Sequence, residues 1–212
     1  MKSIIFVLAF ILSVMAVRAE SQYQEAMKEA IEEMDSAKTG EEFLDLANKF
    51  ARIAEAEPRE WLPDYYASFC TIMQSFFVED NKEKDKLLNN AMDIINKADS
   101  KSPDNSEILV VKSFILQMQI SIDPMVRGMK FGMEADKLIS KAIELNPANP
   151  RPYMLRGQSQ FYTPEQWGGG KAKAKVNLEK AIERYNSFTP ESTIHPNWGK
   201  KETEDILEKC KS

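Results

Sequence analysis

The sequence predicts an all-α fold, and three features of the chain lead to this prediction. Long stretches rich in Ala, Glu, Lys, Leu and Met carry apolar residues at intervals of three and four, as one face of an α-helix requires. The alternating pattern of β-strands is nearly absent. A helix-end pattern of two alanines and a proline recurs along the chain, and such recurrence is typical of helix pairs stacked side by side.

Residues 1–19 are predicted to be a secretory signal peptide. Lys2 gives a positive start, an apolar run extends from Ile4 to Val17, and Ala19 is the small residue that a signal peptidase requires. The run is shorter than the roughly 20 apolar residues that span a bilayer. We therefore expect an exported protein, periplasmic or secreted, with no transmembrane segment in the mature chain and one domain over residues 20–212.

The expected helices of this domain follow in order. A first pair is expected at residues 21–35 and 41–57, joined by a turn at Thr39-Gly40. At the other end, residues 171–186 are expected to form one helix of an incomplete pair and residues 198–211 a capping helix. Between them, helices are expected to stop at Pro58, Pro103, Pro147 and Pro190.

The recurring pattern gives the register of the pairs. Its copies are Ala91, Ala98, Pro103; Ala135, Ala142, Pro147; Ala174, Ala181, Pro190; and, more weakly, Leu46, Ile53, Pro58. A large apolar residue lies inside each clear copy, namely Ile95, Ile139 and Leu178. A small residue lies ten positions after the proline that precedes each copy, namely Ser68, Ser113 and Gly157. Small residues let two helix backbones approach closely, and the large residue fills the groove between them.

This pattern resembles that of the tetratricopeptide repeat family. The resemblance implies a right-handed α-solenoid of about three to four antiparallel helix pairs plus the capping helix. The prolines are farther apart than the roughly 34 residues usual in that family. The excess falls between the two helices of each pair, so we expect elongated tips on one edge of the stack, at residues 78–85, 120–128 and 163–170.

The resemblance also implies a concave groove lined by the first helix of each pair. Its expected lining residues are Tyr65, Phe69, Met73, Val110, Phe114, Met118, Arg151, Met154, Gln158, Phe161 and Tyr162. This lining is unusually apolar for a groove filled with water. Either it receives an apolar or extended segment of a partner, or another part of the chain, such as residues 21–35, covers it.

One tip is distinctive because it holds Trp167, Gly168, Gly169, Gly170 and Lys171. Glycines before a helix can present backbone amides to an anion, but the phosphate-loop pattern is not matched. The alternative is a tight turn with Trp167 packed on neighbouring helices. Trp61 and Trp198 likewise either stack on a sugar or a peptide, or fix the start of a helix.

Composition excludes several classes of function. His195 is the one histidine, so a histidine zinc cluster is excluded, and we expect it to lie exposed in a loop. Removal of the predicted signal peptide takes away Lys2 and Arg18 and leaves 26 of the 28 basic residues against 33 acidic ones. The resulting negative net charge argues against nucleic acid as partner. Cys70 and Cys210 are expected to be unpaired thiols rather than a disulfide.

The sequence therefore predicts a binding protein rather than an enzyme, with no catalytic residues, metal or cofactor. The leading hypothesis is an exported scaffold that binds a protein or peptide through the groove or the tips. The alternative is an accessory protein that binds a carbohydrate or another small ligand through exposed aromatic side chains. A hydrolase would need a carboxylate pair in a cleft, which no sequence pattern here indicates.

Overall fold

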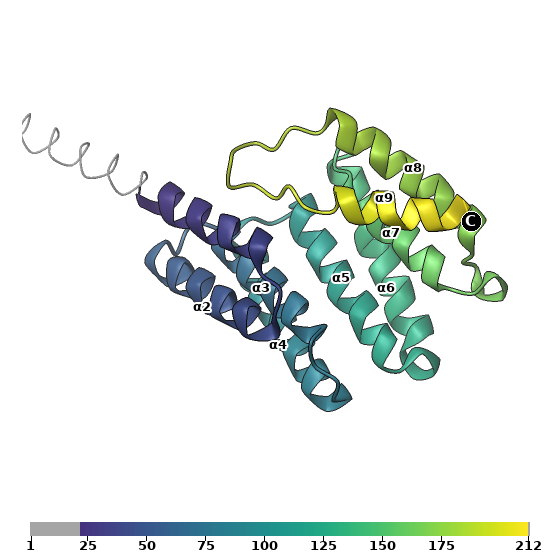
Figure 1. The fold of residues 1–212 in the computed structure, drawn as a ribbon, viewed down its shortest axis with the longest axis horizontal. Helices are drawn as coiled ribbons and strands as arrows, with labels where there is room; N and C mark the ends of the chain where they lie inside the picture. Colours follow the sequence, from purple (N-terminus) through teal and green to yellow (C-terminus); the bar gives the residue numbers. More distant parts are fainter. Residues whose placement is uncertain (1–21, 212) are drawn as a thin grey trace, which may run out of the picture.

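The computed structural model describes residues 22–211, and it is an all-α structure (Figure 1). The predicted signal peptide lies outside the described residues. Residues 22–36 form the first helix of the described chain. The others are α2 (Gly40–Ala56), α3 (Leu62–Ser75), α4 (Asn81–Lys101), α5 (Ser106–Ile122), α6 (Pro124–Leu145), α7 (Arg151–Tyr162), the 3-10 turn η1 (Glu165–Trp167), α8 (Lys171–Ser187) and α9 (Lys200–Lys211).

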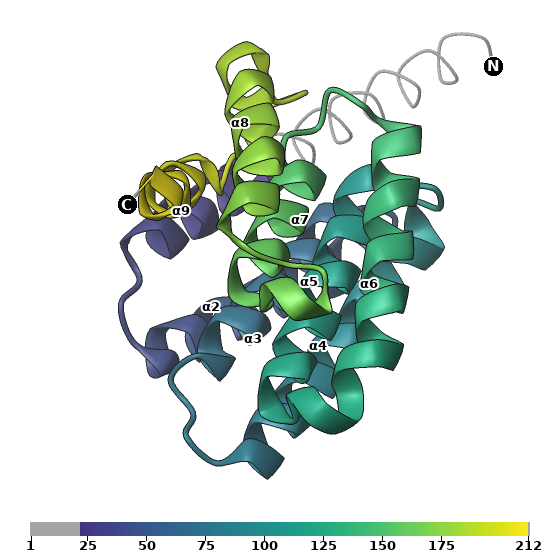
Figure 2. The same ribbon diagram turned by 90° about the vertical axis from the view of Figure 1, so that its right-hand side faces the viewer.

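Consecutive helices pack against one another, and α3, α5 and α7 also contact one another in that order. Figures 1 and 2 show the resulting arrangement, in which α4, α6 and α8 each lie against the helix before them. The helix of residues 22–36 packs through Met27 and Ala30 into the same core as Phe50 of α2 and Tyr66 of α3. At the other end, Ile206 of α9 packs with Leu178 and so covers α8.

Local sequence sets where these helices begin and end. The Thr39 hydroxyl accepts a hydrogen bond from the Glu42 amide, and the Thr39 amide donates one to the Glu42 carboxylate, which completes a capping box at the start of α2. Asp80, Asn105 and Asp123 cap α4, α5 and α6 in a similar way. The helices α2, α4 and α6 each stop two residues before a proline, Pro58, Pro103 and Pro147, as predicted.

The predicted close crossings are confirmed. Ala91, Ala98, Ala142, Ala174 and Ala181 have no exposed surface, and Ala135 has almost none. The Ser68 hydroxyl donates to the Ala91 carbonyl at 2.8 Å, and the Ser113 hydroxyl donates to the Ala135 carbonyl at 3.1 Å. A Cβ atom placed on Gly157 would stand 2.7 Å from Leu178 Cγ. Small residues are therefore required at these positions because the paired backbones nearly touch.

The tips do lie on one edge, but two of the three are mainly helical. Figures 1 and 2 show the α3–α4, α5–α6 and α7–α8 turns along the same edge of the molecule. Only Asp123 separates α5 from α6, so the excess at residues 120–128 extends both helices rather than a loop. Residues 81–85 likewise belong to α4, and only residues 163–170 form an irregular tip.

Two further features concern membrane-spanning helices and the two cysteines. Among the described residues no helix is both long enough and apolar enough to cross a bilayer. Cys70 is buried and Cys210 is half-buried, and both are free thiols, as expected.

Candidate functional site

The inner end of the predicted groove is covered by the segment between α8 and α9. This segment, residues 188–199, is called the strap below. Figure 1 shows that it reaches back across the molecule toward the helix of residues 22–36. Under it, Tyr65, Val110, Arg151 and Met154 are buried. The expectation that another part of the chain covers the groove therefore holds for its inner half, but the strap does so rather than residues 21–35.

Aromatic side chains and a buried cation hold the strap in place. Trp198 packs on Phe69 with ring centroids 4.8 Å apart, and its indole N–H donates to the Tyr65 hydroxyl at 2.8 Å. The Arg151 guanidinium lies 4.9 Å from the Phe188 ring and 5.3 Å from the Trp198 ring. These contacts are cation–π interactions in a site closed to water, where they are strongest.

Arg151 also pairs with Glu107 at 2.8 Å and donates to the Pro196 carbonyl. Burial raises the pKa of Glu107, and the facing guanidinium offsets part of that rise. Arg151 was expected to line the inner surface of the groove. It is instead fully buried, because its charge is balanced by Glu107 and its flat faces are covered by two rings.

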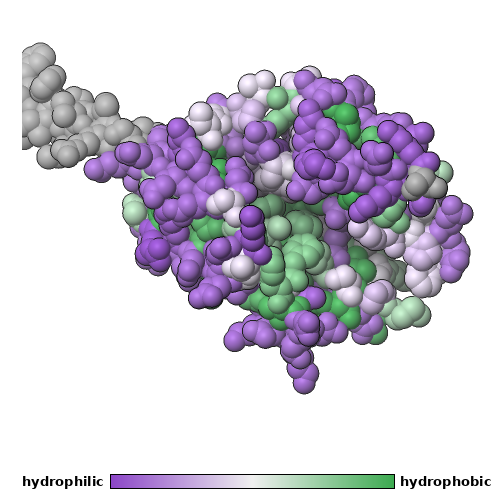
Figure 3. Space-filling model, in the orientation of Figure 1, coloured by the Kyte–Doolittle hydropathy of each residue, from purple (hydrophilic) through white to green (hydrophobic). Residues whose placement is uncertain are grey.

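The outer half of the groove remains open. Met73 of α3, Met118 of α5 and Gln158 of α7 are half-buried here, and Tyr162 is exposed. Phe161 of α7 was also predicted here, but it packs against the cluster of α8 and α9 that contains Leu178 and Ile206. Phe76, at the end of α3, is 51% exposed and lies 6.3 Å from the Phe114 ring. Phe114 in turn stacks on Trp198 at 6.4 Å, so aromatic rings continue from the open end to the strap. Figure 3 shows a hydrophobic strip in the middle of this face, over α5 and its neighbours, with hydrophilic surface on both sides.

The glycine-rich tip does not form an anion site. The amides of Gly168, Gly169 and Gly170 donate to carbonyl groups of Glu165, Pro164 and Gln160, so they are not free for a ligand. Lys171 is exposed at the start of α8. Trp167 is 61% exposed, which contradicts the expectation that it packs on neighbouring helices. The tight turn itself is present, with Gly168 and Gly170 at positive φ angles that glycine tolerates.

His195 is half-buried in the strap rather than exposed in a loop. Its ring packs on Trp61 at 5.9 Å, its Nδ1 lies 2.8 Å from the Ser192 hydroxyl, and its Nε2 lies 3.3 Å from Glu191. Burial lowers the pKa of His195, and Glu191 partly opposes this. Both ring nitrogens are engaged, so His195 offers no free ligand to a metal. Trp61 and Trp198 pack within the protein, as the structural alternative for them predicted.

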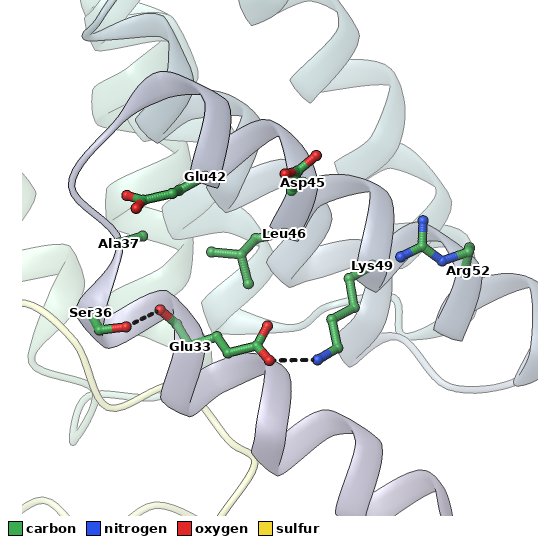
Figure 4. A pocket seen from close by; sticks show the side chains of 8 residues that line it. All are labelled: Glu33, Ser36, Ala37, Glu42, Asp45, Leu46, Lys49 and Arg52. Atoms are coloured by element: carbon green, nitrogen blue, oxygen red, sulfur yellow. Dashed lines mark hydrogen bonds and ion pairs between the residues drawn. The ribbon is translucent and has the colours of Figure 1, made fainter.

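Two shallow hollows complete the surface. One of about 340 Å³ lies between α2 and the preceding helix (Figure 4), with walls from Glu33, Ser36, Ala37, Glu42, Asp45, Leu46, Lys49 and Arg52. Lys49 pairs there with Glu33 at 2.9 Å and Glu29 at 3.2 Å. The other, of about 220 Å³, lies between the strap and residues 28–35, beside His195. Within residues 22–211 no group of three or more His, Cys, Asp or Glu side chains is placed to hold a metal.

The sequence analysis missed the exposed apolar residues nearest the tips. Phe76 and Phe77 follow α3, and Met125, Met129 and Met133 lie on the first half of α6, all of them exposed. Phe76 continues the spacing of Phe69 and Met73, so extending the predicted groove by one helical turn finds it. The methionines lie outside every groove position, because they belong to a second helix of a pair.

Comparison with known proteins identifies a relative. No protein-family model and no curated protein matches the chain. Among solved structures, the HusA haemophore from Porphyromonas gingivalis matches with a TM-score of 0.80 and 35% sequence identity, over 89% of this chain and 92% of that one. Identity at this level over nearly the whole length of both proteins means common descent as well as a common fold. The chain belongs to the same protein family as the HusA haemophore.

Proposed function

We propose that this protein is an exported haem-binding protein that holds the porphyrin at the open outer half of its groove. The observation that carries the proposal is the exposed Phe76 ring beside the half-buried Met73 and Met118 at that end, in a relative of a haemophore. Ligand sites are concave and mostly apolar, with few polar groups. This surface supports a flat apolar ligand better than it supports a sugar, because the tryptophans of the groove are packed inside the protein.

The ring geometry suits a planar ligand. Phe76 is tilted by 41° to Phe114, and Phe114 lies nearly parallel to Trp198, at 27°. Phe76 would offer its exposed ring to one face of a porphyrin, with the nearly buried ring of Phe114 behind it. Trp198, next along the row, is fixed by its hydrogen bond to Tyr65.

The side chains of this half of the groove that could bind the iron are the half-buried thioethers of Met73 and Met118 and the exposed phenol of Tyr162. Thioethers and tyrosine both serve as axial ligands of haem iron in some proteins. His195 lies instead against Trp61 and the helix of residues 22–36. Burial of the porphyrin faces therefore supplies most of the binding free energy.

The peptide-scaffold hypothesis is the weaker one, because the strap fills the inner half of the groove and leaves no long channel for an extended chain. The finer description of the fold as a right-handed, tetratricopeptide-like α-solenoid is also a proposal. Its support is the close crossing in each of the three pairs α3–α4, α5–α6 and α7–α8 and the contacts among α3, α5 and α7.

The test uses two adjacent phenylalanines with equal exposure. Phe76 and Phe77 are both 51% exposed, but Phe76 faces Phe114 whereas Phe77 faces Gly40 and Phe43 of α2. Haem is titrated into the purified protein while the Soret band and tryptophan fluorescence are followed. Burying one Phe side chain contributes about 1.5–3 kcal/mol. Half of that gain is available at a half-exposed ring, so Phe76→Ala is expected to weaken haem binding about tenfold.

Phe77→Ala is the matched control, and its Kd for haem is expected to stay within about twofold, since its ring does not face the groove. Circular dichroism shows whether both variants keep the helical fold. Equal loss in the two variants, or no saturable binding by the unaltered protein, would refute the proposed site.

A further inference from the structure

The exposed apolar side chains of the described residues all lie toward one edge of the molecule. This edge, called the tip edge below, is formed by the α3–α4, α5–α6 and α7–α8 turns and by the start of α2, where Gly40 stands beside Phe77 (Figures 1 and 2). The exposed large apolar side chains are Leu44, Phe76, Phe77, Met125, Val126, Met129, Met133, Tyr162, Trp167 and Val176. Within the described chain the opposite edge, at residues 57–61, 102–105, 146–150 and 188–199, carries none.

Five of these side chains lie at the very ends of the helices. Phe76 and Phe77 follow the last residue of α3, Met125 and Val126 lie in the first turn of α6, and Trp167 lies in the turn between α7 and α8. Each of the five is more than half exposed. Three separate turns therefore present apolar side chains outward, and three turns can meet a flat surface together.

Charged side chains of both signs lie between these apolar residues. Exposed residues of opposite charge occur at each of the three turns, namely Lys82 and Glu83, Lys130 and Glu134, and Glu165 and Lys171. The tip edge therefore has no cluster of a single sign to attract a polyanion or a polycation. A stable protein interface has a continuous apolar core. The hydrated headgroup layer of a membrane, in contrast, accepts separate apolar side chains with charges between them.

We infer that the tip edge binds the surface of a lipid bilayer, with Phe77, Met125, Val126 and Trp167 inserted at the headgroup boundary. Tryptophan is enriched at this level of membrane proteins, because its ring has an apolar body and a polar N–H group. Apolar faces of surface-bound proteins reach about 5–10 Å into the layer.

The open end of the groove lies at the same edge, because Phe76 and Tyr162 belong to both. A protein bound in this way presents its groove to the lipid, where an apolar porphyrin dissolves. This last step alone rests on the proposed function.

Phosphatidylcholine vesicles are the probe, and the partition coefficient is measured by co-sedimentation. All proteins are the predicted mature chain, residues 20–212, because the apolar run of the predicted signal peptide binds lipid by itself. Lipids brominated next to the headgroup report insertion by quenching tryptophan fluorescence. Trp61 and Trp198 pack within the protein, so the quenched residue is Trp167.

The double variant Met125→Ser, Val126→Ser is compared with Met133→Ser on the same helix. Met133 is also exposed, at 60%, but it stands about 12 Å behind Met125 along α6, beyond the depth that inserted side chains reach. The double variant is expected to lower the partition coefficient about tenfold, whereas Met133→Ser is expected to leave it within about twofold. All three positions are exposed, so the variants are expected to fold, and circular dichroism checks this.

The partition coefficient is expected to change less than about twofold between about 0.05 and 0.5 M NaCl, because both signs of charge are present. Quenching is expected in the unaltered protein and not in Trp167→Phe. These measurements are made without haem, so they can fail or succeed independently of the haem titration. Equal losses in the double variant and Met133→Ser, or quenching that persists in Trp167→Phe, would overturn the inference. Absence of partitioning by the unaltered protein would overturn it too and would leave the tip edge to a protein partner.

Discussion

Gly157 tests the close packing of paired helices most sharply when it is compared with Gly132. Both glycines lie inside helices, α7 and α6. The gain in helix propensity from replacing glycine by alanine inside a helix is about 1 kcal/mol. At Gly132 a Cβ atom meets nothing within 4 Å, so Gly132→Ala is expected to stabilise the protein by about that amount.

At Gly157 the new Cβ atom would stand 2.7 Å from Leu178 Cγ and 3.1 Å from the Leu178 backbone nitrogen. The backbone contact cannot be relieved by turning a side chain, and overpacking of this kind costs about 1–3 kcal/mol. Because the helix-propensity gain is the same in both variants, the difference between their unfolding free energies isolates the overpacking. We expect Gly157→Ala to be about 1–3 kcal/mol less stable than Gly132→Ala.

The assay is urea denaturation followed by circular dichroism at 222 nm, with thermal melts alongside. A domain of this size shifts its Tm by about 2–4 °C per kcal/mol, so the two variants are expected to differ by several degrees. The reasoning is refuted if Gly157→Ala is as stable as Gly132→Ala. That result would mean that α7 and α8 do not cross at these residues.

Three further predictions concern the strap and the ligand. Arg151→Met leaves Glu107 buried without its partner and is expected to lower the unfolding free energy, measured in urea, by about 3–5 kcal/mol. The control Lys180→Met breaks an exposed ion pair and is expected to change the unfolding free energy by less than about 1 kcal/mol. Equal effects of the two variants would contradict the buried pair. Burial lowers the pKa of His195 below 6.5, so its contribution to stability is present above about pH 6.5 and is lost as the pH falls below that value. The Tm is therefore expected to fall more between about pH 7.5 and 5.5 in the unaltered protein than in His195→Gln, and parallel curves would contradict this. Iron-free protoporphyrin is expected to bind with a Kd within about tenfold of that for haem, because burial of the ring supplies most of the binding free energy. Fluorescence quenching measures both Kd values. A much larger difference between them would point to an iron–protein bond.

Local sequence predicts much of this fold because its determinants are local. Proline and capping residues set helix ends through backbone hydrogen bonds within a few residues, so the stops before Pro58, Pro103 and Pro147 could be found without a structure. The crossings at Ser68, Ser113 and Gly157 were also accessible, because a small residue at a fixed distance from a proline has one geometric use in a helix pair.

The site depended on contacts that sequence spacing does not encode. Arg151 occupies a groove position by register, yet it is buried because the strap, almost 40 residues later in the chain, places Phe188 and Trp198 on it. His195 is half-buried for the same reason, since Trp61 comes from the other end of the protein. Trp167 is the opposite case: the turn was predicted, but the direction of its side chain depends on how the loop closes on Gln160.

Binding of a porphyrin by the open half of the groove is the central proposal. The most direct measurement is a haem titration of the unaltered protein, Phe76→Ala and Phe77→Ala under one set of conditions, with the Soret band as readout. We expect saturable binding that Phe76→Ala weakens about tenfold and Phe77→Ala leaves within about twofold. Saturable binding that is the same in all three proteins would place the haem elsewhere and contradict the claim.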